Sequence, residues 1–364
     1  MEGELELKRH NMTFDKPNRP PVLLVGNFLS ASKGTRGVCE DLALGLKAAG
    51  WSVITTSARP DRLARLADFL LTIWRQRNQY QVAQVDVYSG PSFQWAELVC
   101  WALRVVRKPY MLTLHGGSLP MFAKRSGERV QHLLKSACAV TTPSAYLFQH
   151  MRAYREDLVL LPNSLEMDKY PFKHRNCPTL KLVWLRGFHD VYNPSLAIKV
   201  VALLVKEFPS VSLVMIGPDK GDGSLESAKE LARRLEVLDK ITFAGPVPKD
   251  TTPQWLDRGD IFLNTTRVDN TPVSVLEAMA CGLCVVSTNV GGIPYLLTNE
   301  CDALLVPGDD DIAMARAVRR LVTEDGLAER LSRSGRKKVE GFGWTNILPE
   351  WEKLLARVAA EART

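Results

Sequence analysis

Short apolar runs alternate along this chain with longer segments whose apolar residues recur at helical spacing. Residues 21–26 (PVLLVG) form an apolar run of the kind that makes a buried parallel strand. A glycine-containing loop follows at 30–37 (SASKGTRG), then a predicted helix over 38–49, ended by Gly50, and a second strand at 52–56. This order predicts a βαβ unit near the start of the chain.

The same alternation continues through most of the sequence. Further strands are expected at 85–88, 110–114, 139–142 and 158–161, and helices at 94–106, 130–135 and 145–151. Residues 163–178 contain Pro171 and Pro178 and show little apolar periodicity, so we interpret them as a linker. After it, strands are expected at 180–185, 212–217, 241–244, 261–264 and 284–287, with helices between them. A last helix is predicted over 348–359, with Pro349 in its first turn, packing back on the first domain.

This pattern predicts an α/β protein made of two Rossmann-like doubly wound domains that face a central cleft. The expected bounds are 1–175 for the first domain, 176–343 for the second and 344–364 for the C-terminal helix. A chain of 364 residues also exceeds the size that one hydrophobic core usually serves. Because ligands bind at the carboxyl ends of strands in such sheets, function is expected in the cleft.

The basic excess of the chain lies entirely in its first half. Residues 1–175 carry 24 Lys and Arg against 15 Asp and Glu, and residues 176–364 carry 23 against 25. Such a surface would attract anionic lipid headgroups or a phosphorylated acceptor, although scattered solvated charges are an equally open interpretation. Nucleic acid is not expected, since no helix-turn-helix, zinc-finger or RNP pattern is present. The cations concerned are Arg62, Arg65, Arg75, Arg77, Arg104, Arg107, Lys108, Lys124, Arg125 and Arg129.

Residues 61–77 (DRLARLADFLLTIWRQR) predict an amphipathic helix within this basic half. Leu63, Leu66, Leu70 and Ile73 fall on one face, while Arg62, Arg65 and Arg75 lie largely off it. The helix either packs on its own sheet or attaches the protein to a membrane surface. The first twenty residues contain no apolar segment typical of a signal peptide, and the longest apolar runs are too short to span a bilayer. We therefore expect a cytoplasmic protein, peripheral at the inner face of the membrane.

Two patterns that would suggest a metal site have simpler interpretations. The seven cysteines are scattered, and Cys281 and Cys284 alone form a C-x-x-C pair, which straddles Gly282 between a helix and a strand. Two small core residues explain that pair better than zinc. The run Asp309–Asp311 follows Pro307 and Gly308 and precedes an amphipathic helix, where Asp serves as a cap. No metal or other cofactor is expected.

Residues 260–294 (DIFLNTTRVDNTPVSVLEAMACGLCVVSTNVGGIP) are the most informative segment. The segment predicts a strand, a polar loop and a helix that opens at Pro272 or Ser274 and ends at Gly282. The free N–H groups of residues 273–275 and the helix dipole would form an anion site. Asp269 and Glu277 have seven residues between them, and both can face one cleft. A carboxylate can accept two hydroxyl hydrogen bonds, so one acid suits a ribose diol and the other the hydroxyls of a sugar.

This segment resembles the acidic-x(seven)-Glu signature of glycosyltransferase family four, followed by the words EAMACG and VGGIP. The resemblance implies the fold called GT-B, a sugar-nucleotide donor and transfer that retains the anomeric configuration. It also implies that Glu277 holds the ribose and that Asp269 lies beside the transferred sugar. Three positions depart from the family pattern: Asp269 is usually Glu, Cys284 replaces a common Pro, and Tyr295 replaces a common Glu.

Further positions match the family or suit a phosphate. Arg186 begins RGFHDVYN after the first strand of the second domain, where a guanidinium can bind a diphosphate. The Lys that the family places a few residues later is absent, and Lys220 is the candidate to replace it. His115, in LTLHGG, resembles a histidine that contacts the donor sugar. With Arg186, Asp269 and Glu277 it is expected to be catalytic. The residues expected to bind the donor are Gly34, Thr35, Arg36, Gly37, Asn163, Gly217, Lys220, Pro246, Val247, Asn270, Thr271, Pro272 and Val273.

The resulting hypothesis is a retaining glycosyltransferase that moves a sugar from a nucleotide diphosphate donor to an acceptor hydroxyl. The acceptor is expected to be a sugar or lipid-linked sugar, in the synthesis of a glycan, polysaccharide or glycolipid. Two alternatives stay open: a sugar-nucleotide epimerase with the same two-domain plan, and a non-catalytic scaffold that binds a nucleotide sugar. A NAD-dependent dehydrogenase is disfavoured, because the G-x-G-x-x-G fingerprint is absent.

Overall fold

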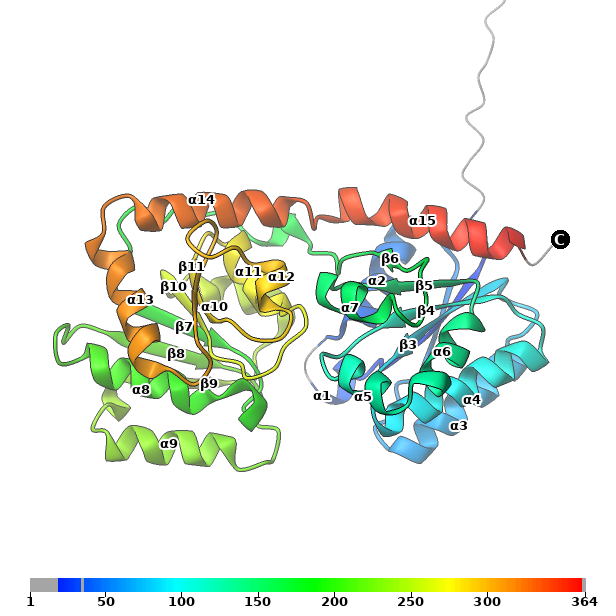
Figure 1. Cartoon of the computed structure of the whole chain (residues 1–364), viewed down its shortest axis with the longest axis horizontal. Coiled ribbons are helices and arrows are strands. Elements are labelled where there is room, and N and C mark those ends of the chain that lie inside the picture. The colour runs from blue at the N-terminus through cyan, green and yellow to red at the C-terminus, as the bar shows by residue number, and fades with distance from the viewer. Residues whose placement is uncertain (1–18, 34–35, 362–364) are drawn as a thin grey trace, which may run out of the picture.

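The structure is a computed structural model that describes residues 19–33 and 36–361. Two six-stranded sheets, each with all paired strands parallel, form the centres of two domains (Figure 1). The first sheet has the order β2-β1-β3-β4-β5-β6. Its strands are β1 (Val22–Val25), β2 (Val53–Thr56), β3 (Val82–Val87), β4 (Tyr110–Leu114), β5 (Ala139–Thr142) and β6 (Val159–Leu160).

The second sheet has the order β12-β11-β10-β7-β8-β9, which is the doubly wound arrangement predicted from the alternation. Its last strand, β12, was not expected from the sequence; it is only three residues long. The strands are β7 (Lys181–Leu185), β8 (Ser212–Ile216), β9 (Ile241–Gly245), β10 (Ile261–Asn264), β11 (Cys284–Thr288) and β12 (Leu304–Val306).

Helices cover both faces of each sheet, and this explains why the strands are apolar throughout. In β1, Leu23 and Val25 belong to one core cluster, and Val22 and Leu24 to another on the opposite face. The first-domain helices are α1 (Ser30–Lys33), α2 (Val38–Ala48), α3 (Arg62–Arg75), α4 (Pro91–Val105), α5 (Leu119–Arg125), α6 (Gly127–Lys135) and α7 (Ala145–Met151). The second-domain helices are α8 (Pro194–Leu204), α9 (Ser224–Arg234), α10 (Thr252–Leu256), α11 (Val273–Ala280), α12 (Ile293–Leu296), α13 (Asp311–Thr323) and α14 (Leu327–Glu340).

The last two helices run along one edge of both domains (Figure 1). Helix α14 packs against α11 in the second domain, whereas α15 (Trp344–Glu361) packs against α2 and β3 of the first. Ile347, Trp351 and Leu355 of α15 join the core cluster that contains Val22 and Leu24. The chain therefore returns to the first domain after completing the second.

The start of α15 was predicted wrongly. The helix begins at Trp344, so Pro349 lies in its second turn rather than its first. The Trp344 ring packs on α2 at Gly45, where an added Cβ would lie 2.6 Å from ring carbons. This packing extends the helix by one turn and outweighs the backbone hydrogen bond that Pro349 cannot make.

Other element boundaries also differ from the sequence prediction. The loop expected over 30–37 contains the short helix α1, the segment before residue 130 forms a separate helix, α5, and the linker contains a 3-10 turn (Met167–Lys169). In α3 the buried residues are Arg65, Phe69 and Ile73, so Arg65 lies on the buried face instead of off it. Its guanidinium donates to the carbonyls of Arg59 and Pro60 and to Asn27 Oδ1, at 2.7–2.9 Å, which satisfies the buried charge.

Candidate functional site

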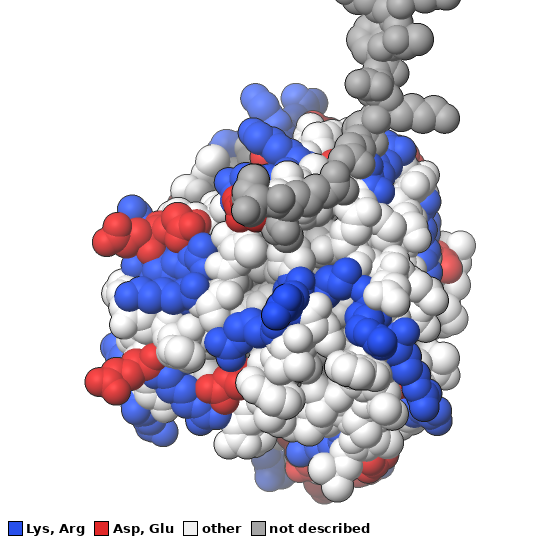
Figure 2. Space-filling model, turned by 90° about the vertical axis from the view of Figure 1, so that its right-hand side faces the viewer, with Lys and Arg blue, Asp and Glu red and all other residues white. Residues whose placement is uncertain are grey.

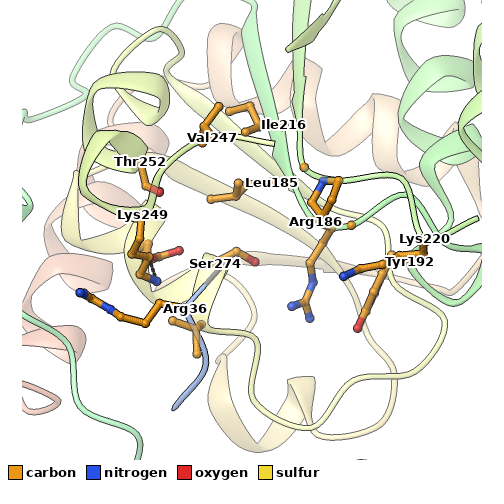
Figure 3. A pocket seen from close by; sticks show the side chains of 15 residues that line it. Arg36, Leu185, Arg186, Tyr192, Ile216, Lys220, Val247, Lys249, Thr252 and Ser274 are labelled. Carbon is orange, nitrogen blue, oxygen red and sulfur yellow. Dashed lines mark hydrogen bonds and ion pairs between the residues drawn. The ribbon is translucent and has the colours of Figure 1, made fainter. Parts of the chain in front are cut away.

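A pocket opens between the carboxyl ends of β7 and β8 and the amino end of α11 (Figure 3). Most of its wall comes from the second domain, and Arg36 of the first domain closes one side. The predicted residues that line it are Arg36, Arg186, Gly217, Lys220, Val247, Val273 and Glu277. The second-domain residues of this set come together because strands in a parallel sheet end at the same edge.

The amino end of α11 supplies backbone donors to this pocket. Pro272 is the N-cap, and Val273 is the first helical residue. The Val275 N–H, predicted to be free, donates instead to the Pro272 carbonyl at 3.1 Å, which leaves the amides of Val273 and Ser274. The Ser274 hydroxyl also lines the pocket and is buried without a partner in the described chain. Two amides and a hydroxyl at a helix amino end suit an anion.

Glu277 lies one turn further along α11 and is 3% exposed. Its Oε1 accepts a hydrogen bond from the Tyr170 hydroxyl at 2.6 Å and forms an ion pair with Lys249 Nζ. Burial, and then the charge of Glu277, raises the pKa of the Tyr170 phenol, so this group stays protonated and donates. A buried carboxylate held by one hydroxyl and one ammonium is oriented toward the pocket that it lines.

Arg186 follows β7 directly and projects into the pocket (Figure 3). It forms an ion pair with Asp269, from the loop between β10 and α11, and its guanidinium carbon lies 4.6 Å from the centre of the Tyr192 ring. Burial lowers the pKa of the guanidinium, yet arginine stays charged at physiological pH. The two residues predicted to be catalytic in the second-domain loops, Arg186 and Asp269, are thus in direct contact.

Two lysines far from Arg186 in the sequence, Lys220 and Lys249, also reach this pocket. Lys220 lies across Gly187, where an added Cβ would come within 2.4 Å of the lysine Cε. Lys249 lines the opposite wall beside Glu277 (Figure 3). Together with Arg36 and Arg186 they give the pocket four cationic side chains among the described residues.

In the sequence VGGIP (residues 290–294), close packing at the site explains the second glycine. Gly292 lies against the loop that carries Asp269, and a Cβ there would be 2.0 Å from the carbonyl oxygen of Asn270. The Gly292 N–H donates to the Asp269 carbonyl at 2.8 Å, and the Asn270 N–H donates to Asp269 Oδ1 at 2.8 Å. A glycine is therefore needed to hold the loop of Asp269 close to α12.

His115 does not line the main pocket. It lines a small cavity of the first domain with Asp86 and Asn163, and its Nε2 lies 3.1 Å from Asp86 Oδ1. The Tyr88 ring stacks on the imidazole with centroids 5.2 Å apart. Gly117, two residues on, approaches the backbone of Asp269 so closely that a Cβ added to this glycine would lie 3.4 Å from the carbonyl. The histidine loop is thus in contact with the loop of the second domain.

The remaining predicted donor residues are distributed around the site. Gly34 and Thr35 lie outside the described residues. The Gly37 N–H donates to Glu40 Oε2 at 2.6 Å at the start of α2, and Thr271 lines a separate cavity with Tyr295. Pro246 and Asn270 are not among the residues that line the main pocket. Arg36 pairs with Asp41 at 2.6 Å and with Glu166 at 3.1 Å, so it is held in place at the junction of the domains.

The two patterns that could suggest metals are explained by the structure. Asp310 is the N-cap of α13 and accepts from the Ala313 N–H at 2.8 Å, as predicted. Cys281 and Cys284 are buried, and burial raises the pKa of each thiol to about 12. Over residues 19–33 and 36–361 no group of three or more His, Cys, Asp or Glu side chains is arranged to hold a metal ion.

Sequence reasoning missed Tyr170, Lys249 and Ser274. Tyr170 lies in the segment interpreted as a linker, and its contact with Glu277 spans 107 residues of sequence. Lys249 follows the FAGPV word by two residues, but only the fold brings it to α11. Ser274 lies inside the quoted segment, so its place in the first turn of a helix at the pocket could have been proposed from the sequence.

A family comparison matches the second domain. Residues 174–338 match the model of the family described as glycosyl transferases group 1. A D-inositol 3-phosphate glycosyltransferase of Streptomyces avermitilis is 29% identical over 270 residues, which is 69% of this chain and 58% of that protein. A subunit of the phosphatidylinositol N-acetylglucosaminyltransferase of Arabidopsis thaliana is 31% identical over 143 residues, or 39% of this chain and 30% of that protein. The chain thus spans less than two thirds of each of these relatives.

Solved structures share the whole two-domain fold. A sucrose-phosphate synthase from Thermosynechococcus elongatus superposes with a TM-score of 0.76 at 18% identity, covering 94% of this chain and all of that chain. The Anabaena protein HepE, solved in complex with UDP and glucose, gives 0.73 at 14% identity, covering 93% and 100%. These likenesses confirm the predicted GT-B fold. In residues 174–338, the chain is thus similar to the glycosyl transferases group 1 family.

Proposed function

We propose that this protein is a retaining, metal-independent glycosyltransferase that moves a sugar from a nucleotide diphosphate donor to an acceptor hydroxyl. The observation that carries the proposal is the pocket in which the α11 amino end, Arg186 and buried Glu277 converge. The family match of the second domain supports it. In this assignment the diphosphate lies by Arg186 and the amides of Val273 and Ser274, and the ribose diol binds Glu277.

The chemistry follows from where charge develops. As the bond to the sugar breaks, negative charge collects on the leaving diphosphate, and the four cations of the pocket stabilise it. The acceptor hydroxyl approaches the face that the diphosphate leaves, so the departing phosphate can take its proton and no enzyme base is required. Asp269 stays beside the sugar that becomes positively charged. Val247 offers its backbone to the base, and His115 faces the sugar once the domains close.

A thermal-shift panel tests donor binding. A ligand that binds only the folded state stabilises it by about 2.7 kcal/mol when its concentration is about a hundred times Kd. We expect one of UDP, GDP and ADP to raise Tm by several degrees, and adenine without phosphates to have no effect. UDP is the first choice, because HepE was solved with UDP. No shift with any of the three diphosphates would contradict the proposed site.

Product analysis separates the transferase from its alternatives. A transferase releases nucleoside diphosphate only when an acceptor is present, an epimerase interconverts the sugar nucleotide without one, and a scaffold only binds it. Sugars and lipid-linked sugars are the acceptors to test. Inositol phosphates and phosphatidylinositol are added because the curated relatives carry those names.

The proposal also concerns a membrane surface. We propose that the protein is cytoplasmic and attaches peripherally to an anionic bilayer through α3 and α4, which pack side by side. Outward-facing apolar residues recur at helical spacing on both helices, and two are tryptophans, Trp74 (55% exposed) and Trp101 (58% exposed). The α3–α4 surface consists of Leu63, Leu71, Trp74, Leu98, Trp101 and Val105.

Charge on the same helices fits anionic lipid. Arg62 and Arg75 of α3, Arg104 of α4 and Arg107 just after α4 form no ion pair within the described chain. The end-on view of the first domain shows Lys and Arg spread over a largely uncharged face (Figure 2). Tryptophan at a bilayer interface and about 1 kcal/mol per surface cation favour such binding. Among the described residues no helix is both long and apolar enough to cross a membrane.

Vesicle sedimentation tests this attachment. We expect the full chain to pellet with phosphatidylglycerol vesicles and to stay in the supernatant with phosphatidylcholine. Replacing both tryptophans (Trp74→Ala with Trp101→Ala) should lower the bound fraction at least about tenfold, since interfacial tryptophans anchor a protein to the bilayer. Ile312→Ala, which removes an equally exposed apolar side chain from α13, is the matched control. Equal pelleting of both variants and the wild type would remove the α3–α4 surface from the proposal.

A further inference from the structure

Arg186 makes few polar contacts for an arginine whose side chain is only 19% exposed. A guanidinium has five N–H donors, and the buried Arg65 and Arg175 use all three of their nitrogens on protein oxygens. Arg186 instead pairs with the carboxylate of Asp269, and its buried Nε has no hydrogen-bond partner in the described chain. The guanidinium therefore keeps N–H donors for a ligand, while hydrogen bonds to the protein do little to fix its position.

The ring of Tyr192 supplies a different kind of contact to this guanidinium. Tyr192 lines the donor pocket, and the centre of its ring lies 4.6 Å from the guanidinium carbon of Arg186. An aromatic face attracts a cation within about 6 Å of its centre. Figure 3 shows both side chains extending into the pocket. A contact with the face of a ring restrains the plane of the guanidinium and leaves its N–H donors free.

The backbone of Tyr192 is anchored to the sheet that carries Arg186. The Tyr192 carbonyl accepts a hydrogen bond from the Thr265 hydroxyl at 2.7 Å, and this hydroxyl accepts one from Trp184 Nε1 at 2.8 Å. Trp184 and Thr265 are 0% and 1% exposed. Trp184 lies on β7, two residues before Arg186, and Thr265 directly follows β10. The ring is thus held by the same two strands that precede Arg186 and the loop of Asp269.

We infer that Tyr192 is a positioning residue for the proposed reaction: its ring holds the Arg186 guanidinium where the free N–H groups meet the leaving diphosphate. This role rests on the proposed function, because it acts on the step in which charge collects on the diphosphate. Donors that are already in place stabilise such charge without having to reorganise as it develops. The contact is made by the face of the ring, so the role does not depend on the phenol hydroxyl.

Replacing the ring tests this role. Tyr192→Leu should lower kcat about tenfold, measured by single-turnover kinetics at saturating donor, because the guanidinium loses the attraction of the ring face. The Kd of the nucleoside diphosphate should stay near that of the wild type. Tyr192→Phe keeps the face of the ring and should keep most of the rate. Phe148→Leu removes a ring of α7 that lies 5.5 Å from the guanidinium carbon of Arg152, outside the donor pocket, and is the matched control.

A double-mutant cycle shows whether Tyr192 acts through Arg186. In an Arg186→Ala protein no guanidinium remains to be positioned, so the addition of Tyr192→Leu should lower kcat no further. Losses that multiply would show that the two residues act independently and would overturn the inference. A loss in Tyr192→Phe as large as that in Tyr192→Leu would also overturn it. Thermal melting compares the folds, and Tyr192→Met replaces the leucine variant if that protein does not fold.

Crystal structures separate a failure of this role from a failure of the proposed function. We expect the Arg186 guanidinium to occupy one position in the wild type and in Tyr192→Phe, and to be displaced or spread over several positions in Tyr192→Leu. A wild type that transfers no sugar would contradict the proposed function, and the three structures would still decide where the ring holds Arg186. The same Arg186 position in all three proteins would overturn the inference, whatever the rates.

Discussion

Glu277→Gln is expected to lower kcat/KM for the sugar nucleotide about a hundredfold, mainly by raising the Kd of the nucleotide. The substitution keeps the volume of the side chain but removes the charge that accepts the ribose hydroxyls. A hydrogen bond to a charged group contributes about 1.5–3 kcal/mol, which corresponds to roughly 10- to 150-fold. The substitution also removes the carboxylate with which Lys249 forms an ion pair beside the pocket. Calorimetric titration and steady-state kinetics measure the two effects.

The control for this prediction is an acid outside the pocket. Glu300 of the second domain pairs with Arg320 at the surface, where an ion pair contributes about 0–1 kcal/mol, so Glu300→Gln should leave kcat/KM nearly unchanged. Thermal melting of both variants shows whether the fold is retained. Unchanged nucleotide affinity in a folded Glu277→Gln protein would remove this residue from the ribose site.

Arg186→Ala is expected to reduce kcat by about 100- to 1,000-fold, the range found when one preorganised electrostatic donor is removed from an active site. The guanidinium would act on charge that grows as the diphosphate leaves, so the loss should fall on turnover more than on donor binding. The substitution also frees Asp269 from its ion pair. Single-turnover kinetics at saturating donor measures the effect.

Two comparisons strengthen the test of Arg186. Arg186→Lys should restore little of the lost rate, because an ammonium cannot reproduce the planar fork of the guanidinium or its stacking on Tyr192. Arg267→Ala removes a more exposed arginine of the same domain, paired with Asp190 and Asp309, and should leave kcat nearly unchanged. A wild-type rate for Arg186→Ala would exclude the assigned role.

Much of the fold can be predicted from the sequence because each strand is buried on both faces. Runs such as VLLV in β1 alternate between two core clusters, so they must be apolar at every position. Short elements escaped this reasoning: α1 has four residues and β12 has three. Their formation depends on pairing and packing with distant segments rather than on periodicity.

Some residues of the site could likewise be predicted from the sequence, and others could not. Arg186, Lys220 and Glu277 could be placed together, since Arg186 and Lys220 follow strands and Glu277 lies on a helix that begins at the same edge of the sheet. Lys249 and Tyr170 could not, because only the folded chain brings them to Glu277. Arg65 was misplaced because its buried guanidinium is satisfied by carbonyls that no sequence pattern reveals. Long-range polar contacts are thus the part of the site that requires the structure.

The central claim is that the facing domains hold a diphosphate between the amino end of α11 and Arg186. A crystal structure of the full chain with the nucleoside diphosphate that gives the largest thermal shift tests it most directly. The account predicts diphosphate oxygens within hydrogen-bond distance of the Arg186 guanidinium and the Val273 and Ser274 amides, with the ribose hydroxyls on Glu277. A nucleotide bound elsewhere, or bound here with its ribose away from Glu277 and its phosphates away from Arg186, would contradict the account.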